Sequence, residues 1–135
     1  MAKILLIGHG SFPEGVKSAL SMLIGKTDSI EVLAFSKLDE LSLFEKKLEE
    51  ILNHQTGLLI YADFTGGAPQ QIAARKVKEL KSHHHSLISG ASLHTLLELS
   101  LLFLYEKSSE VSAGLDRLIK LEGSNCLLIL PDQNE

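Results

Sequence analysis

The chain has little of what marks secreted, membrane-embedded or nucleic-acid-binding proteins. Among its 135 residues there is one cysteine and no tryptophan, so no intrachain disulfide can form. No apolar run approaches the roughly 20 residues that cross a bilayer, and the run from Ile4 to Ile7 is shorter than the apolar region of a signal peptide. The 13 lysines and arginines are scattered and outnumbered by 17 acidic residues, which leaves no basic surface for a phosphate backbone. We therefore expect a cytoplasmic protein that does not bind nucleic acid.

The composition is that of an ordinary globular domain. Hydrophobic residues make up 44% and charged residues 22% of the chain, and no proline-rich or low-complexity segment interrupts it. A chain of this length can bury a substantial core as one unit, and it contains neither an internal repeat nor a linker. We therefore expect a single domain over residues 1–135, with Cys126 as a small residue of its core.

Apolar runs suited to buried strands alternate with segments of helical periodicity. The runs cover residues 3–7, 30–35, 57–62, 86–89 and 125–130. Helical spacing is found over 11–25, over 39–53, from Pro69 to Leu80, from Leu93 to Leu104 and over 109–121. Ser11 and Glu14 form a capping-box pattern at the start of the first helix. This order predicts an α/β fold, in which a doubly wound, mainly parallel central sheet is flanked by helices.

His9 is the most informative single residue of the chain. It lies between Gly8 and Gly10 at the end of the first apolar run. Glycine on both sides keeps side-chain bulk away, so a partner can approach the imidazole closely. Taken alone, the tripeptide is more typical of a tight turn than of a reactive site, so the assignment depends on a second motif.

A carboxylate and a Gly-Gly turn follow the third apolar run, in the segment Asp63-Phe64-Thr65-Gly66-Gly67-Ala68-Pro69. In a doubly wound sheet the first and third strands are neighbours, and ligands bind in the crevice at their carboxyl ends. We therefore expect His9 and Asp63 to face the same crevice. The structural alternative is that Asp63 only caps the turn and that the two glycines only serve backbone geometry.

A histidine beside an aspartate is suited to nucleophilic phosphoryl transfer. One imidazole nitrogen attacks only if its lone pair is free, so the other must hold the proton; Asp63 would fix that tautomer and stabilise the charge that develops on the His9 ring. Backbone N–H groups and hydroxyls of the two glycine turns would attract the phosphoryl group. The candidate phosphate-binding residues are Gly10, Ser11, Thr65, Gly66, Gly67 and Ala68. This chemistry needs neither a metal ion nor an organic cofactor.

Two further patterns do not favour a ligand site. The glycines of the first motif miss the G-x-G-x-x-G spacing of dinucleotide-binding turns, and no acidic residue ends the second strand. The three consecutive histidines, 83–85, have no cysteine or carboxylate cluster beside them, so we expect a solvated turn there instead of a metal site.

Three motifs follow one another along the chain: Gly8-His9-Gly10-Ser11-Phe12-Pro13-Glu14-Gly15, then Asp63-Phe64-Thr65-Gly66-Gly67-Ala68-Pro69, then Ser89-Gly90-Ala91-Ser92-Leu93-His94-Thr95-Leu96-Leu97-Glu98. In this order and spacing they resemble the mannose-type IIA domains of the bacterial phosphoenolpyruvate-dependent sugar phosphotransferase system. Together the motifs extend over nearly the whole domain.

The resemblance implies a phosphoryl carrier. His9 would accept a phosphoryl group from the protein HPr and pass it to a IIB component, which phosphorylates a sugar taken up through a IIC/IID membrane permease, and Asp63 would be the partner of His9. The resemblance also implies a homodimer in which the C-terminal strand, about 125–130, crosses to the partner's sheet. Because the chain ends soon after this strand instead of continuing into a IIB domain, we expect a free-standing IIA subunit.

The chain departs from the family pattern at two places near the expected site. Ala68 stands where the family commonly has Ser or Thr, which removes a hydroxyl worth on the order of 1–3 kcal/mol to a charged group. The segment Ser92-Leu93-His94 replaces an Asn-Leu-Pro segment, and His94 is a lesser candidate for the crevice. Two other functions remain open: the phosphotransfer subunit of a dihydroxyacetone kinase, and a regulatory binding module without catalysis.

Overall fold

The computed structural model describes residues 3–25, 28–37, 40–105, 117, 119–120, 122 and 125–131. Its strands are β1 (Ile4–His9), β2 (Ile30–Phe35), β3 (Leu59–Ala62), β4 (Ser86–Ser89) and β5 (Leu127–Ile129). Its helices are α1 (Phe12–Ile24), α2 (Leu41–His54), α3 (Ala68–Glu79), the short 3₁₀ helix η2 (Lys81–His83) and α4 (Leu93–Tyr105). The strands and the first four helices predicted from the sequence are all present. The helix predicted over 109–121 lies outside the described residues except for three helical positions within it.

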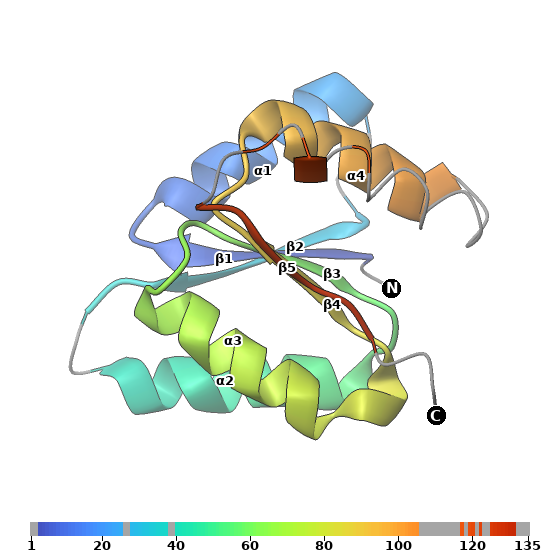
Figure 1. Ribbon diagram of the computed structural model, residues 1–135. Helices are drawn as coiled ribbons and strands as arrows, with labels where there is room; N and C mark the ends of the chain where they lie inside the picture. The colour runs from blue at the N-terminus through green and yellow to red at the C-terminus, as the bar shows by residue number, and fades with distance from the viewer. Residues whose placement is uncertain are drawn as a thin grey trace.

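One five-stranded sheet organises the molecule, with the strand order β2-β1-β3-β4-β5. Strands β1 to β4 are parallel to their neighbours, whereas β5 pairs antiparallel with β4. Helices α1 and α4 cover one face of the sheet and α2 and α3 cover the other (Figure 1). The predicted α/β class with a doubly wound, mainly parallel sheet is confirmed.

Strand β1 is apolar along its length because it lies in the middle of this sandwich. Its side chains alternate between the two faces, so Leu5 and Ile7 join the core under α2 and α3, and Ile4 and Leu6 join the core under α1 and α4. All four are 0% exposed. A strand buried on both faces reads as a continuous apolar run, which explains why the sequence showed no alternation here.

Helix α1 carries the first motif away from the sheet. Pro13 occupies its first turn, where a missing N–H costs nothing, and Gly25 ends it in the left-handed conformation with φ of 86°. The predicted capping box is wrong, because the Ser11 side chain makes no capping hydrogen bond. Ser11 has φ of −86° and ψ of 3°, outside the extended region from which an N-cap hydroxyl reaches the helix amides.

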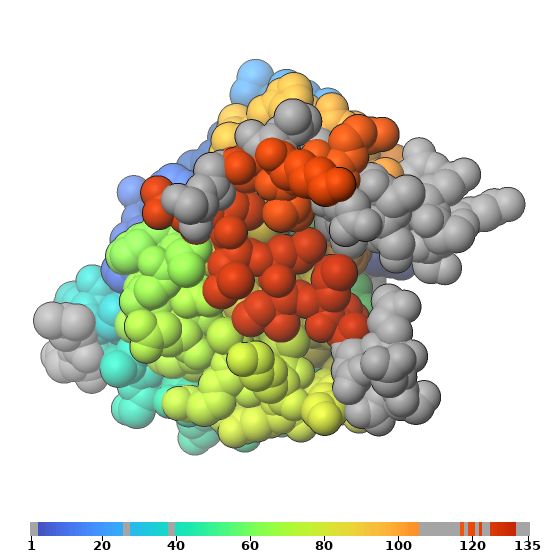
Figure 2. Space-filling model, in the orientation of Figure 1, coloured from blue at the N-terminus to red at the C-terminus, as the bar shows by residue number. Residues whose placement is uncertain are grey.

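The C-terminal strand lies at one edge of the sheet. Figure 2 shows its residues on the surface between α3 and α4. Leu127 and Leu130 are each 41% exposed, and Cys126, predicted as a core residue, is only partly buried. Among the described residues, no helix is both long enough and apolar enough to cross a membrane.

Candidate functional site

His9 and Asp63 meet at the carboxyl ends of β1 and β3. The two strands are neighbours in register, with Ile7 beside Ala62, so the residues that follow lie together. Asp63 Oδ2 accepts a hydrogen bond from the backbone N–H of His9 at 2.8 Å and lies 2.6 Å from His9 Nδ1. A carboxylate oxygen can only accept, so Nδ1 carries the ring proton and the lone pair of Nε2 is free. The Asp63 side chain is 10% exposed and that of His9 is 43% exposed, so the imidazole ring is accessible and the carboxylate is largely covered.

Two phenylalanines hold the sides of the His9 ring. Phe64 stacks on it with ring centroids 5.4 Å apart and planes inclined by 23°. Phe35, at the end of β2, contacts it edge-on with centroids 5.8 Å apart. The two phenylalanines thus pack apolar surface against the ring, which is still 43% exposed.

Three glycines of the two motifs have a physical requirement at their positions, two because of close packing and one because of its backbone conformation. A Cβ atom on Gly8 would lie 2.9 Å from Asp63 Cγ, and one on Gly67 would lie 3.1 Å from His9 Cε1. Gly10 has φ of +58°, in the left-handed region that favours glycine. Gly8 is thus needed for the approach of Asp63 and Gly67 for the approach of His9, whereas Gly10 is needed for its backbone angle.

Several of the predicted phosphate-binding groups are already bonded within the protein. The N–H of Gly10 donates to the Phe35 carbonyl at 2.9 Å, and the N–H of Gly66 donates to Gln70 Oε1 at 3.1 Å. The N–H of Gly67 points to the Phe64 carbonyl at the longer distance of 3.4 Å. These amides are less available to a ligand than the sequence indicated.

The amides that open α1 and α3 are better placed. The first N–H groups of a helix have no acceptor within it, and those of Phe12 and Ala68 stand at the starts of the two helices that follow His9 and Asp63. Helix N-termini attract anions. Ser11, exposed and not engaged as a cap, adds a hydroxyl at the start of α1.

Thr65 joins the site to the third motif and to the C-terminal segment. Its hydroxyl donates to the Asn125 carbonyl at 2.6 Å and lies 2.8 Å from Ser89 Oγ. A Cβ atom on Gly90, which has φ of +71°, would lie 2.2 Å from the same Asn125 oxygen. The end of β4 thus forms a cradle for the chain that leads into β5.

His94 does not reach His9. Its side chain is 79% exposed, and its Nε2 lies 3.8 Å from Glu98 Oε1 on the same helix. The start of α4 is instead capped by Ser92, whose hydroxyl accepts the Thr95 N–H at 3.2 Å, and Glu122 accepts hydrogen bonds from the hydroxyls of Ser92 and Thr95. These hydrogen bonds lower the pKa of the Glu122 carboxyl below its ordinary value.

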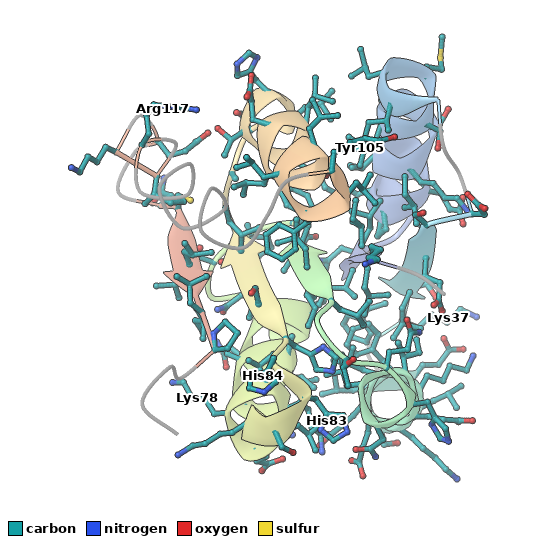
Figure 3. The ribbon with its side chains drawn as sticks, turned by 90° about the vertical axis from the view of Figure 1, so that its right-hand side faces the viewer. Lys37, Lys78, His83, His84, Tyr105 and Arg117 are labelled. Atoms are coloured by element: carbon teal, nitrogen blue, oxygen red, sulfur yellow. The ribbon has the colours of Figure 1, made fainter. Side chains whose placement is uncertain are left out.

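The prediction of a solvated histidine turn is wrong for His85, which is 1% exposed. Its Nε2 donates to the Leu52 carbonyl at 2.9 Å, and its Nδ1 accepts from the Leu58 N–H at 3.2 Å. The ring therefore satisfies one backbone group at the end of α2 and one before β3, and burial lowers its pKa. Its neighbour His84 is exposed, in the turn before β4 (Figure 3).

Sequence reasoning missed two residues beside the site, Gln70 and Gln71. Gln71 Nε2 donates to the Gly66 carbonyl at 2.7 Å, so the two side chains hold both backbone groups of Gly66. The only signal in the sequence is their spacing, since they follow the glycine by four and five residues and stand in the first turn of a helix that opens with a proline. Within the described part of the chain, no group of three or more His, Cys, Asp or Glu residues could hold a metal ion.

Comparison with known proteins assigns the chain to a family. The family described as "PTS system fructose IIA component" matches residues 3–114. A PTS system fructose-specific EIIA component of Bacillus subtilis (strain 168) is 26% identical over 101 residues, which are 73% of this chain and 68% of that protein.

Solved structures share the fold at lower identity. The phosphotransferase system component EIIA from Streptococcus agalactiae has a TM-score of 0.73 and 22% identity, over 87% of this chain and 92% of that one. The mannose/sorbose-specific IIA subunit from Enterococcus faecalis has a TM-score of 0.71 and 22% identity, over 98% of each chain. A sigma-54 interaction domain protein from Enterococcus faecalis has a TM-score of 0.68 and 14% identity, over 88% of this chain and 90% of that one. With the family match covering most of its length, the chain belongs to the mannose/fructose-type IIA components of the sugar phosphotransferase system.

Proposed function

We propose that this protein is a phosphoryl carrier that uses His9. It accepts a phosphoryl group from HPr in the cytoplasm and passes it to a IIB component, which supports sugar uptake through a IIC/IID permease. The single observation that carries the proposal is the contact of 2.6 Å between Asp63 Oδ2 and His9 Nδ1. It leaves the Nε2 lone pair of an accessible ring free to attack phosphorus.

The transfer step follows from this geometry. The Nε2 lone pair forms a bond to phosphorus while the bond between phosphorus and the donor nitrogen of HPr breaks, and the electron pair of that bond stays with the donor. The His9 ring becomes positively charged, and Asp63, which accepts the Nδ1 proton, stabilises that charge. The first-turn amides of Phe12 and Ala68 attract the negative oxygens of the incoming group.

The surroundings of His9 suit protein partners. Phe12 and Phe64 are 45% and 53% exposed, and aromatic side chains are enriched where proteins meet. A groove of about 420 Å³ starts at Phe12 and runs past Val16 and Tyr61 to Leu93. A protein donor or acceptor would cover these apolar groups when it brings its own phosphorylated residue to His9.

A homodimer is part of the proposal. The apolar side chains of Leu127 and Leu130 on the edge strand β5 remain accessible, and a second copy would cover them. Exchange of β5 between two copies would keep the same antiparallel pairing with β4.

The test is the intact mass of the protein after incubation with phosphoenolpyruvate, enzyme I and HPr. The wild type should gain one acid-labile phosphoryl group, and His9→Ala should gain none. His54→Ala is the matched control, because His54 is an exposed histidine at the end of α2, and it should behave like the wild type. A wild type that gains no mass beside active HPr would sink the carrier proposal.

A regulatory binding module is the second candidate. It is favoured by the likeness to the sigma-54 interaction domain protein, which has this fold at 14% identity. It would be preferred if His9 were phosphorylated but no IIB component accepted the group, so the second half of the transfer decides between the two.

A further inference from the structure

Gly66 is held on both sides by two consecutive side chains of α3. Gln70 Oε1 accepts the Gly66 N–H at 3.1 Å, and Gln71 Nε2 donates to the Gly66 carbonyl at 2.7 Å. We call this pair the glutamine clamp. Gly66 has φ of +94°, and glycine gives up more conformational freedom than any other residue when it is fixed. The clamp is therefore what limits this turn to one conformation.

The clamped turn is the surface against which the His9 ring lies. Each of the two hydrogen bonds fixes one of the peptide planes that flank Gly66. The next residue, Gly67, is buried, and its hypothetical Cβ would lie only 3.1 Å from His9 Cε1 and 3.0 Å from the Phe64 ring. The turn thus sets the position of Phe64, which stacks on His9, and of the backbone beside the ring edge.

Asp63 and the glutamine clamp act on different properties of His9, the first on the ring tautomer and the second on the tilt of the ring. Asp63 decides which ring nitrogen carries the proton, but its single contact to the ring, at Nδ1, leaves the tilt of the ring about that contact free to vary. The turn limits that tilt from the other side. Phosphoryl transfer needs the attacking lone pair in line with the bond that breaks, and a misplacement of about 1 Å can cost a hundredfold in rate.

We infer that Gln70 and Gln71 are positioning residues, which fix the orientation of the His9 ring through the Gly66–Gly67 turn. The inference rests on the proposed function for its effect on transfer, but not for its effect on the ring. Gln70 is 4% exposed although it is polar, which a side chain without a structural task would not be.

The first readout is the proton NMR spectrum of the His9 ring in the unphosphorylated protein. Stacking on Phe64 displaces the ring proton shifts from those of a free histidine. In Gln70→Met and Gln71→Met, which keep side-chain size without the hydrogen bonds, these shifts should move toward the free values. The ring proton on Nδ1 should remain, because Asp63 still accepts it. Gln55→Met is the matched control, since Gln55 donates to Glu31 Oε1 at 2.8 Å in the connection before β3, away from the site.

The second readout is the rate of transfer from phosphorylated HPr. Each clamp variant should be slower by about tenfold, and the double variant by much less than a hundredfold, because both side chains hold the same residue. Ring shifts and rates equal to those of Gln55→Met would overturn the inference. A wild type that accepts no phosphoryl group would overturn the proposed function instead, and the ring shifts would still decide whether the clamp orients His9.

Discussion

Replacing Asp63 by asparagine tests the core of the site, because it keeps the size of the side chain and changes only its hydrogen bonding and charge. The carboxylate accepts three contacts: Oδ2 accepts the backbone N–H of His9 at 2.8 Å and faces Nδ1 at 2.6 Å, and Oδ1 accepts the Phe64 N–H at 3.0 Å. An asparagine amide has one oxygen and one NH₂ group. When its oxygen faces His9, its NH₂ group faces the Phe64 N–H, so two donors oppose each other. Turned over, its NH₂ group opposes the His9 N–H and imposes the wrong ring tautomer.

The magnitude follows from the lost charge. Hydrogen bonds to a charged group contribute about 1.5–3 kcal/mol, against about 1 kcal/mol for neutral ones, so the charge that develops on His9 loses about 0.5–2 kcal/mol of stabilisation. At about 1.4 kcal/mol per tenfold change this slows transfer roughly 2- to 30-fold. The fraction of rings in the wrong tautomer adds to the loss, and the roughly 10⁴-fold effect of this substitution in serine-protease triads sets an upper bound.

The assay is the initial rate of phosphoryl uptake from phosphorylated HPr, followed by intact mass after rapid quenching. Asp28→Asn is the matched control, because Asp28 is exposed in the turn before β2 and loses the same charge. A denaturant-unfolding curve shows whether the Asp63 variant is folded. If a folded Asp63→Asn protein transferred within about twofold of the control, the assignment of Asp63 as the residue that fixes the tautomer would be refuted.

Three further predictions concern groups that are packed at the two ends of the sheet's strands. Gly8→Ala should lower the free energy of unfolding by about 1–3 kcal/mol, because its methyl group would overlap the Asp63 carboxylate at the end of β3. Gly15→Ala should not lower it, because the space around Gly15 is open. Denaturant unfolding of the two variants makes the comparison. Burial lowers the pKa of His85 from 6.5, so the unfolded chain takes up a proton more readily than the folded chain. The free energy of unfolding should therefore fall as the pH drops below about 6.5. His85→Gln should flatten that fall, which urea titrations from pH 8 to 5 would measure. Gly90→Ala should displace the segment before β5, because the added methyl group would overlap the Asn125 carbonyl, and this should expose Cys126. The Cys126 thiol should then react several-fold faster with a maleimide. An unchanged rate would contradict the close packing of this segment against the end of β4.

The sequence predicted the meeting of His9 and Asp63 because topology alone brings them together. Each residue follows an apolar run that is buried on both faces, and the order β2-β1-β3 makes those two runs neighbours. The carboxyl ends of parallel strands share one edge of the sheet, so no side-chain detail was needed. The alternation of strands and helices predicts the parallel direction, and the doubly wound topology makes the first and third strands neighbours.

Contacts made by side chains to distant backbone groups could not be predicted in this way. His85 is buried because a carbonyl at the end of α2 and an N–H before β3 need partners, and neither need is visible in the residues next to it. Gln70 has the polarity of an exposed helical residue, yet it points back to Gly66 and is buried. Such residues satisfy backbone groups left over by the fold, so they can be recognised only after the elements have been placed.

The phosphate-binding predictions depend both on strand topology and on side-chain contacts to distant backbone groups. The proton of the Thr65 hydroxyl serves one acceptor at a time, and it is committed to the Asn125 carbonyl, which limits Thr65 as a donor to a phosphoryl group while that segment is seated. The amide of Ala68 has no such commitment within α3, because the first N–H groups of a helix lack internal acceptors. The departure from Ser or Thr at this position therefore removes one hydroxyl but leaves the helix N-terminus, which is the part of the site that the fold itself supplies.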